Sequence, residues 1–171
     1  MYGSASIRGH CDGDTSVVRV EGVGDADAYL TAMGPWPATM VTSRNIISVY
    51  KTPAISFNAK CVFTNTVPTG PYRGAGRPES KFFLERLIDK AAAEIGIDRV
   101  ELRRRNLISP DMLPHTTPVD LIYDSGEFET IMDMCLERAD YTGYPARKAS
   151  SDAAGMLRGI GIAPYLETTA G

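Results

Sequence analysis

"TGPYRGAGRPES", residues 69–80, joins an apolar run to a strongly helical one and therefore decides how the chain turns. Gly74 and Gly76 carry no Cβ, so a ligand can approach their backbone amides closely. Pro78 and Glu79 suit the first turn of a helix, whose free N–H groups would point back toward the loop. The stretch predicts a strand-to-helix turn with features of an oxyanion or phosphate site.

The loop matches neither of two common phosphate-binding motifs. A P-loop needs glycine five residues after Gly70, where Ala75 stands, and no Lys-Ser/Thr pair follows. The dinucleotide fingerprint needs glycine three residues after Gly76, where Glu79 stands. From the residues alone two interpretations stay open: a loop that holds a ligand, and a plain connection with solvated arginines.

Helices are predicted on the C-terminal side of this loop. Apolar residues recur at helical spacing up to Gly96, which suits the end of a helix. The stripe predicted to be buried consists of Phe83, Leu84, Leu87, Ile88, Ala91 and Ile95. A second helix is predicted to begin at Asp98, with Glu101 completing a capping box, and to end at residues 103–105. We interpret the three arginines there as a solvated helix end, since no aromatic residues or basic excess accompany them.

The rest of the C-terminal half divides at its prolines and glycines. Residues 109–120 are predicted to be loop because they contain three prolines. A third helix is predicted after Ser125, and its apolar face consists of Phe128, Ile131, Met132, Cys135 and Leu136. Residues 157–171 predict a new strand with no partner behind it, which would leave an exposed edge. The chain is therefore expected to be part of a larger protein.

Strands are predicted on the N-terminal side of the loop. Residues 6–23 indicate two short strands around a tight turn at Asp12-Gly13. Residues 38–50 predict a helix, and residues 54–65 alternate in hydrophobicity as a strand does. Strands and helices in mixed order, without regular βαβ alternation, favour an α+β (mixed α/β) fold of short sheet segments packed with helices.

Composition limits the classes of function. The 171 residues are 43% hydrophobic with a formal net charge of −3, so no global charge favours nucleic acid or an acidic membrane. No window reaches the roughly 18 apolar residues of a membrane span, and the N-terminus lacks a secretory signal pattern. Cys11, Cys61 and Cys135 show no metal-binding spacing, and we expect reduced thiols in a cytoplasmic protein.

Other polar residues carry weaker signals. His10-Cys11 offers too few ligands to hold a metal, so no metal site is predicted from the side chains. Glu21, Asp25 and Asp27 are interpreted as polar residues on an exposed strand face rather than as paired catalytic carboxylates.

Four stretches together resemble the molybdenum-binding large subunit of the molybdenum hydroxylases, the family of xanthine dehydrogenase, aldehyde oxidase and carbon monoxide dehydrogenase. They are residues 27–46, 64–80, 85–108 and 158–171. The resemblance implies hydroxylation of an aldehyde or N-heterocycle carbon of a small-molecule substrate, with oxygen derived from water. It also implies a molybdenum pterin cofactor, commonly molybdopterin cytosine dinucleotide in bacteria. Its implied partners are the rest of the large subunit and iron–sulfur and FAD subunits or domains.

The resemblance assigns cofactor binding to the loop beside the molybdenum, which consists of Tyr72, Arg73, Gly74, Ala75, Gly76 and Arg77. Bare amides and a fixed arginine suit an anionic centre, in agreement with the chemistry of the residues themselves. Gly74 stands where copper-containing carbon monoxide dehydrogenases carry the copper-binding cysteine, so no molybdenum–copper site is expected. Ala75 stands where animal xanthine dehydrogenases place a phenylalanine, so the loop gives no support for purine specificity.

The family's catalytic glutamate lies in a glycine-rich motif that this sequence lacks. That glutamate is the general base of the family, and a base must lie within reach of the proton it removes. We therefore assign no catalytic residue within this chain. We expect residues 1–156 to be part of a first molybdopterin-binding domain and residues 157–171 to be the first strand of the next. The chain is then a fragment of an oxidoreductase subunit, incomplete at both ends and inactive alone. The alternatives are a non-catalytic binding or assembly module and a remnant of a degraded gene.

Overall fold

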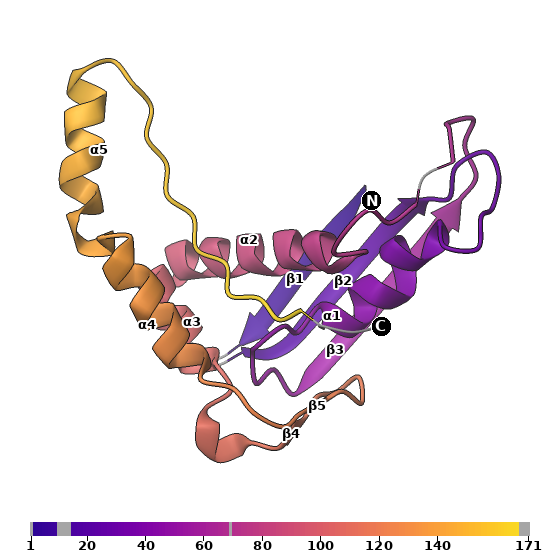
Figure 1. Ribbon diagram of the computed structural model, residues 1–171, viewed down its shortest axis with the longest axis horizontal. Coiled ribbons are helices and arrows are strands. Elements are labelled where there is room, and N and C mark those ends of the chain that lie inside the picture. Colours follow the sequence, from indigo (N-terminus) through magenta and orange to yellow (C-terminus); the bar gives the residue numbers. More distant parts are fainter. Residues whose placement is uncertain (1, 10–14, 69, 168–171) are drawn as a thin grey trace.

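The computed structural model describes residues 2–9, 15–68 and 70–167. Its fold is mixed α+β, as predicted, with a sheet and helices in layers (Figure 1). The elements in chain order are β1 (Tyr2–Gly9), β2 (Thr15–Asp25), η1 (Pro37–Val41), α1 (Thr42–Asn45), β3 (Ala54–Val62), α2 (Arg77–Ile95), α3 (Arg99–Asn106), η2 (Pro110–Met112), β4 (His115–Thr116), β5 (Ile122–Tyr123), α4 (Phe128–Arg138), η3 (Tyr141–Gly143) and α5 (Tyr144–Ala153). The η1 element is a π-helical turn, and η2 and η3 are 3-10 turns.

The first three strands form one sheet in the order β1-β2-β3. β1 and β2 pair antiparallel, which confirms the predicted strand pair; the Asp12-Gly13 turn itself lies outside the described residues. β2 and β3 pair parallel, so the chain crosses over between them through η1 and α1. The strand predicted at residues 54–65 is confirmed and ends at Val62. Asp25 and Val62 are partners at the same end of the sheet, directly before the loops of the candidate site.

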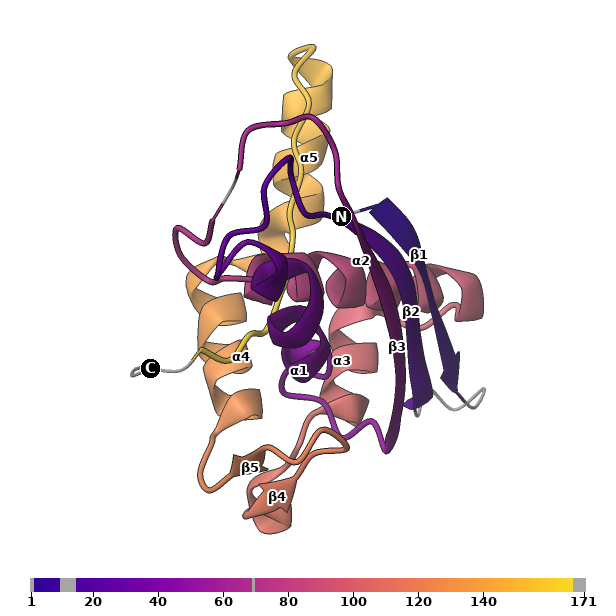
Figure 2. The ribbon, with the colours of Figure 1, turned by 90° about the vertical axis from the view of Figure 1, so that its right-hand side faces the viewer.

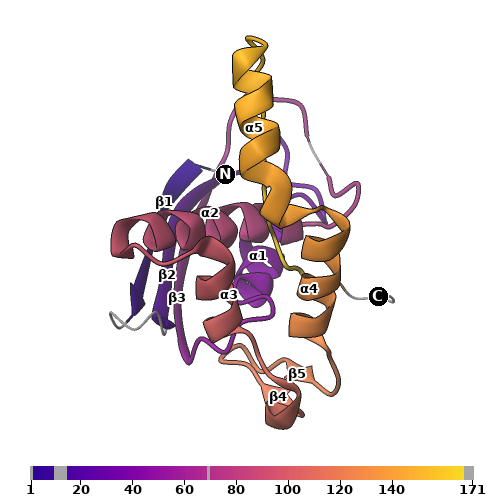
Figure 3. The ribbon, with the colours of Figure 1, turned by 90° about the vertical axis from the view of Figure 1, so that its left-hand side faces the viewer.

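The layers are visible from two opposite sides in Figures 2 and 3. The β1–β3 sheet forms one side, α1, α2 and α3 lie in the middle, and α4 lies on the far side, with α5 projecting beyond it. After α5, residues 154–167 return to the middle of the molecule (Figure 1). Among the described residues, each helix is too short or too polar to cross a membrane.

The buried core lies between β2 and the middle helices. Val20 of β2 and Leu84 of α2 are each 1% exposed, and Ile88 of α2 joins the same cluster. Burying side chains of this size stabilises the fold by about 1.5–3 kcal/mol each. The predicted stripe on α2 is thus confirmed at Leu84 and Ile88. Its last member is wrong, because Ile95 is exposed and Ala92 takes the buried position near the end of the helix.

Helix boundaries follow the predicted signals in two places and depart from them in a third. α2 is followed by Gly96 at φ 71°, and the Asp98 carboxylate caps α3 by accepting a hydrogen bond from the Val100 amide at 2.8 Å. The helix predicted at residues 38–50 is shorter and ends at Asn45. The β-branched residues that follow it favour helix poorly and turn into the core instead.

Two predictions for the C-terminal half are wrong. Residues 109–120, predicted as loop, include η2 and β4, and β4 pairs antiparallel with β5. Residues 157–171 are predicted as a strand, but residues 157–167 belong to neither sheet of the described chain, and residues 168–171 lie outside it. Arginine side chains donate hydrogen bonds to the backbone carbonyls of residues 160 and 162, where a neighbouring strand would otherwise donate.

The arginines that end α3 form ion pairs. Arg103 is 0% exposed, and its guanidinium bonds to Glu85 at 2.9 Å and to Asp89 at 2.8 Å. Arg104 pairs with carboxylates of α4, and Arg105 pairs with a carboxylate one turn earlier on α3. The interpretation of a solvated helix end is therefore wrong for Arg103, because carboxylates of α2 pack directly against it.

Candidate functional site

The loop before α2 turns the chain by an unusual backbone conformation. Gly74, Ala75 and Gly76 have φ values of 74°, 43° and 98°, so three successive residues lie in the left-handed region. The Arg77 amide donates to the Gly74 carbonyl at 2.9 Å, and the Ser80 amide donates to the Gly76 carbonyl at 3.0 Å, which starts the helix. Within the described part of the chain, the amides of Ala75 and Gly76 have no hydrogen-bond partner. Ala75 lines the pocket described below, so its amide is available to an acceptor on a ligand, whereas Gly76 is buried.

The two glycines are required by close contacts as well as by backbone angle. A Cβ on Gly76 would lie 2.5 Å from the Pro37 carbonyl oxygen and 3.0 Å from the Thr42 amide. A Cβ on Gly74 would lie 2.7 Å from the Pro78 ring. The buried Thr42 hydroxyl also lies 3.1 Å from the Gly76 carbonyl oxygen. The inner side of the turn is thus filled by η1 and α1, and its outer side is left for a ligand.

A pocket of about 530 Å³ lies on the outer side of this turn. Its walls come from the loop itself, from the end of β2 and the segments that follow β2 and β3, from the start of η1, and from the first turn of α2. The lining residues are Asp25, Asp27, Gly34, Pro37, Thr66, Val67, Gly70, Pro71, Tyr72, Arg73, Ala75 and Glu79. The pocket therefore combines one guanidinium, several carboxylates and a stretch of bare backbone.

The six predicted loop residues fall into three groups in the structure. Tyr72, Arg73 and Ala75 line the pocket, and the Arg73 guanidinium lies 5.7 Å from the centre of the exposed Tyr72 ring. Gly74 and Gly76 shape the turn without lining the pocket. Arg77 lies elsewhere, because its Nε pairs with Glu167 at 2.8 Å.

A hydrogen-bonded pair of aspartates forms the wall opposite the loop. Asp25 accepts hydrogen bonds from the Asp27 amide and from the Thr64 hydroxyl, both at 2.8 Å. Asp27 is 4% exposed and accepts from the Thr66 hydroxyl at 3.2 Å. The network ties the end of β2 to the end of β3. The interpretation of Asp27 as a residue of an exposed strand face is therefore wrong.

Sequence reasoning missed this wall, although a signal for it existed. Asp25 ends one strand and Asp27 follows it, while Thr64 and Thr66 follow another strand, so in both places two hydrogen-bonding residues stand two positions apart just where a strand ends. The missing information was that β2 and β3 are parallel neighbours, which brings the two pairs to the same end of the sheet.

Glu79 contributes to the pocket a carboxylate oxygen that could accept a hydrogen bond from a ligand. One of its carboxylate oxygens, Oε2, is buried and has no hydrogen-bond partner within the described residues. The first turn of α2 stabilises the negative charge. The pocket thus offers donors, from Arg73 and the loop amides, together with an acceptor at Glu79. This combination fits a ligand that carries both anionic oxygens and N–H donors, as a pterin cofactor does.

Metal-binding side chains are a separate question. Among the described residues, no group of three or more His, Cys, Asp or Glu side chains is arranged to hold a metal ion. Cys61 and Cys135 are free and exposed, and neither lines this pocket. His10-Cys11 lies outside the described residues.

Comparison with known proteins identifies a family. The sequence model of the molybdopterin cofactor-binding domain matches residues 2–107. The 6-hydroxypseudooxynicotine dehydrogenase complex subunit gamma of Paenarthrobacter nicotinovorans is 34% identical over 132 residues, covering 74% of this chain and 17% of that protein. The carbon monoxide dehydrogenase large chain of Hydrogenophaga pseudoflava is 30% identical over 161 residues, covering 91% of this chain and 20% of that protein.

A solved structure agrees with these matches. Quinoline 2-oxidoreductase from Pseudomonas putida 86 superimposes with a TM-score of 0.82 at 28% identity, covering 90% of this chain and 20% of that chain. The chain spans about one fifth of the length of these relatives. It belongs to the family of molybdopterin cofactor-binding domains and corresponds to a segment of the large subunits of molybdenum hydroxylases.

Proposed function

We propose that this chain forms one wall of a molybdenum pterin site in the large subunit of a molybdenum hydroxylase. The observation that carries the proposal is the Tyr72–Arg77 loop, whose left-handed turn presents bare amides beside a pocket at the start of α2. Family membership supports the cofactor class, and the donors and acceptor of the pocket suit it. The reaction class is hydroxylation of an aldehyde or N-heterocycle carbon of a small molecule with oxygen derived from water.

The residues of this chain have binding and orienting roles in that reaction. The Ala75 amide and the Arg73 guanidinium would donate to anionic oxygens of the cofactor, and the buried Glu79 oxygen would accept from one of its N–H groups. The Asp25–Asp27 network holds the opposite wall in place. When bound, the cofactor supplies the oxidation of the substrate carbon. A Cβ at Gly74 or Gly76 would collide with the protein, so a side chain at either position would displace the backbone of this wall.

The proposal assigns the general base to a segment outside this chain, so the chain alone is expected to be inactive. Residues 1–156 would be part of one molybdopterin-binding domain and residues 157–171 the beginning of the next. The cofactor form would be molybdopterin cytosine dinucleotide. Electrons would pass to iron–sulfur and FAD partners in the cytoplasm, with no nucleic acid involved. A copper site is not part of the proposal, because Gly74 offers no thiol.

A chimeric large subunit tests this function. The segment of quinoline 2-oxidoreductase that this chain resembles is replaced by residues 1–171, and the chimera is produced in a host that makes the cofactor. Molybdenum and released cytosine nucleotide are then measured per chain. We expect near-stoichiometric cofactor, a loss of about tenfold in Arg73→Ala, and little change in Arg86→Ala, which removes an exposed arginine elsewhere on α2.

Two results would contradict the proposal. One is a soluble chimera, with its iron–sulfur and FAD partners bound, that holds no molybdenum. The other is an equal effect of Arg73→Ala and Arg86→Ala on cofactor content. Hydroxylation by the 171-residue chain alone would refute the assignment of the base to another segment.

A further inference from the structure

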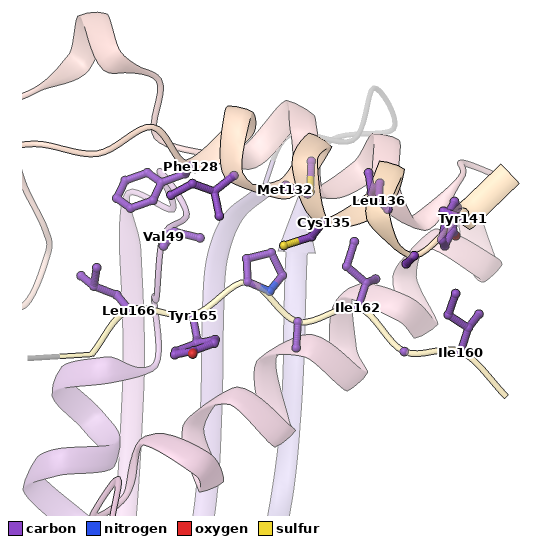
Figure 4. Close-up of a pocket in the computed structure, with 15 residues that line it drawn as sticks. Val49, Phe128, Met132, Cys135, Leu136, Tyr141, Ile160, Ile162, Tyr165 and Leu166 are labelled. Atoms are coloured by element: carbon purple, nitrogen blue, oxygen red, sulfur yellow. The ribbon is translucent and has the colours of Figure 1, made fainter.

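A second cavity of the chain differs from the candidate pocket in its chemistry. It is an apolar groove of about 390 Å³ between α4 and the extended segment, residues 157–167 (Figure 4). Ile160 and Ile162 point toward α4, and every residue that lines the groove is uncharged. The charged groups that suit the anionic oxygens of a cofactor lie instead in the pocket beside the loop, so the support of that pocket decides how a cofactor would be held.

Thr42 touches the backbone of two walls of the candidate pocket. Pro37, the first residue of η1, lines one wall, and Ala75 of the loop lines another. The Thr42 hydroxyl has two carbonyl oxygens within hydrogen-bond reach, that of Pro37 and, at 3.1 Å, that of Gly76. One side chain therefore bridges η1 and the loop, although Thr42 and Gly76 are 34 positions apart in the sequence.

This bridge is closed to solvent. Thr42 is 0% exposed, and a Cβ placed on Gly76 would lie 3.0 Å from the Thr42 hydroxyl oxygen. The Gly76 carbonyl also accepts a hydrogen bond from the Ser80 amide of α2 at 3.0 Å, so its orientation is fixed from two sides. A buried hydroxyl needs a hydrogen-bond partner within the protein, and here the partners belong to the backbone of the pocket walls.

Ala75 needs such support because its backbone conformation is unfavourable. Its φ of 43° lies in the left-handed region, where a residue with a Cβ is uncommon. A residue in this region persists only when its surroundings hold it there. Thr42 fixes the next residue, Gly76, so the hydroxyl acts on the Ala75 amide at the pocket through one intervening residue.

A simpler role for Thr42 would be a hydrogen bond within its own helical turn. Serine and threonine side chains often bond to a carbonyl about one turn earlier, and the bond to Pro37 is of this kind. Ser43 shows the same pattern, since its hydroxyl donates to the Met40 carbonyl at 2.9 Å. The contact between Thr42 and Gly76 is not explained in this way, because it crosses from α1 to the loop.

We propose that Thr42 is a positioning residue of the cofactor pocket: its hydroxyl holds the Pro37 wall and the Gly76 turn at a fixed spacing and keeps the Ala75 amide at the pocket. The hydroxyl acts through the backbone, because it is buried on the inner side of the turn. Removing it would leave two buried carbonyl oxygens without the donor between them, which favours separation of the two walls. The inference rests on the proposed function, which assigns the cofactor to this pocket.

The first half of the test uses the 171-residue chain without cofactor. Thr42→Val removes the hydroxyl and keeps the branched shape, Thr42→Ser keeps the hydroxyl, and Ser43→Ala removes the neighbouring local bond. NMR spectra are recorded at mildly acidic pH, where unprotected amides remain visible. We expect the Ala75 and Gly76 resonances to shift in Thr42→Val and to move far less in the other two variants. Unmoved resonances in Thr42→Val, or equal shifts in all three variants, would overturn the inference.

The second half measures how firmly the cofactor is held in the chimeric large subunit described above. The rate at which molybdenum is lost during dialysis is expected to rise about five- to tenfold in Thr42→Val, because one buried hydrogen bond supports the wall. Thr42→Ser should keep this rate within about twofold of the unmodified chimera. Thr42→Ala removes the same hydroxyl with less bulk, and it replaces Thr42→Val if that chimera is insoluble.

A core variant separates positioning from general stability. Ile88→Val shortens a buried side chain of α2 and lowers the stability of the fold without removing a contact of the loop. We expect it to leave the rate of molybdenum loss within about twofold. Equally fast loss from Ile88→Val and Thr42→Val would overturn the positioning role, since reduced stability would then account for both.

The two halves together distinguish this inference from the proposed function. A chimera that holds no molybdenum, while Thr42→Val shifts the loop resonances of the chain, would contradict the proposed function and support the link between Thr42 and the loop. Shifted loop resonances with an unchanged rate of molybdenum loss in Thr42→Val would overturn the positioning role and leave the proposed function in place.

Discussion

At the level of single residues, Gly76 is the loop glycine with the least room for a side chain. Its φ is 98°, and a Cβ would lie 2.5 Å from a backbone carbonyl oxygen. Gly76→Ala is expected to lower the free energy of unfolding by about 2–4 kcal/mol, because backbone strain and a collision add together. Gly96→Ala is the control, since Gly96 also has positive φ but a Cβ added there would meet no atom within 4 Å, and about 1 kcal/mol is expected. Urea unfolding measures both, and equal losses would contradict the packing argument.

The half-buried Lys81 predicts a pH dependence of the unfolding free energy. Burial lowers the pKa of Lys81 from 10.5 to about 8, and Glu85 partly offsets this shift. Between pH 8 and 10.5 the unfolded chain binds more protons at this residue, so folding is favoured as pH rises through that window. Relative to Lys81→Met, the native chain should gain at most about 3 kcal/mol of unfolding free energy from pH 8 to 10.5.

The control for this pH dependence is Lys90→Met on the exposed side of α2. Compared with Lys90→Met, the native chain should show little change in relative stability over the same window. Urea unfolding at pH 7.5, 9 and 10.5 provides the measurement. A stability difference between the native chain and Lys81→Met that stays constant with pH would contradict the assigned environment of Lys81.

Sequence alone predicted the loop residues better than their surroundings. Gly74 and Gly76 were selected because a ligand can approach glycine amides closely, and their positive φ values are a feature that the sequence did not predict. That Pro37 and Thr42 fill the inner side of the turn depends on contacts across more than 30 residues, which no local pattern encodes. Asp27 was misread for the same reason, since its partner Thr66 lies in the loop after β3.

At the level of secondary-structure elements, Arg103 joins α2, α3 and the extended segment. Its guanidinium bonds to Glu85 and Asp89 of α2 and to the carbonyl of residue 162. Arg103→Ala is expected to lower the unfolding free energy by about 3–5 kcal/mol, because the buried Glu85 would lose its cation. Arg105→Ala, which breaks an exposed pair with Glu101, should cost less than about 1 kcal/mol. Chemical denaturation distinguishes the two, and similar costs would contradict the buried network.

Elements with local signals were predicted well, and those set by distant partners were not. α2 and α3 carry their own caps at Gly96 and Asp98, so their ends are confirmed. Residues 157–167 have strand-like alternation, but a strand requires a neighbour, and arginine side chains take that place in the described chain. β4 and β5 are two residues each, too short for a periodic pattern to detect.

At the level of the whole molecule, the cofactor loop and the extended segment are physically connected. Arg77 begins α2 immediately after the loop, and its Nε pairs with Glu167 at the end of the described segment. The same segment is held by buried Arg103 and borders the groove beside α4. A displacement of this segment would therefore reach the backbone beside the pocket through the Arg77–Glu167 ion pair.

Glu167→Gln tests this connection. The pair is partly exposed, so its loss should change the unfolding free energy by less than about 1 kcal/mol. The amide resonances of Ala75 and Gly76 should nevertheless shift, because Arg77 adjoins them and loses its charged partner. Glu94→Gln, which removes an exposed carboxylate paired with Lys90 on the same helix, should leave these resonances in place. NMR spectra of the two variants decide the matter: if neither moves the loop amides, the segment and the pocket are mechanically independent.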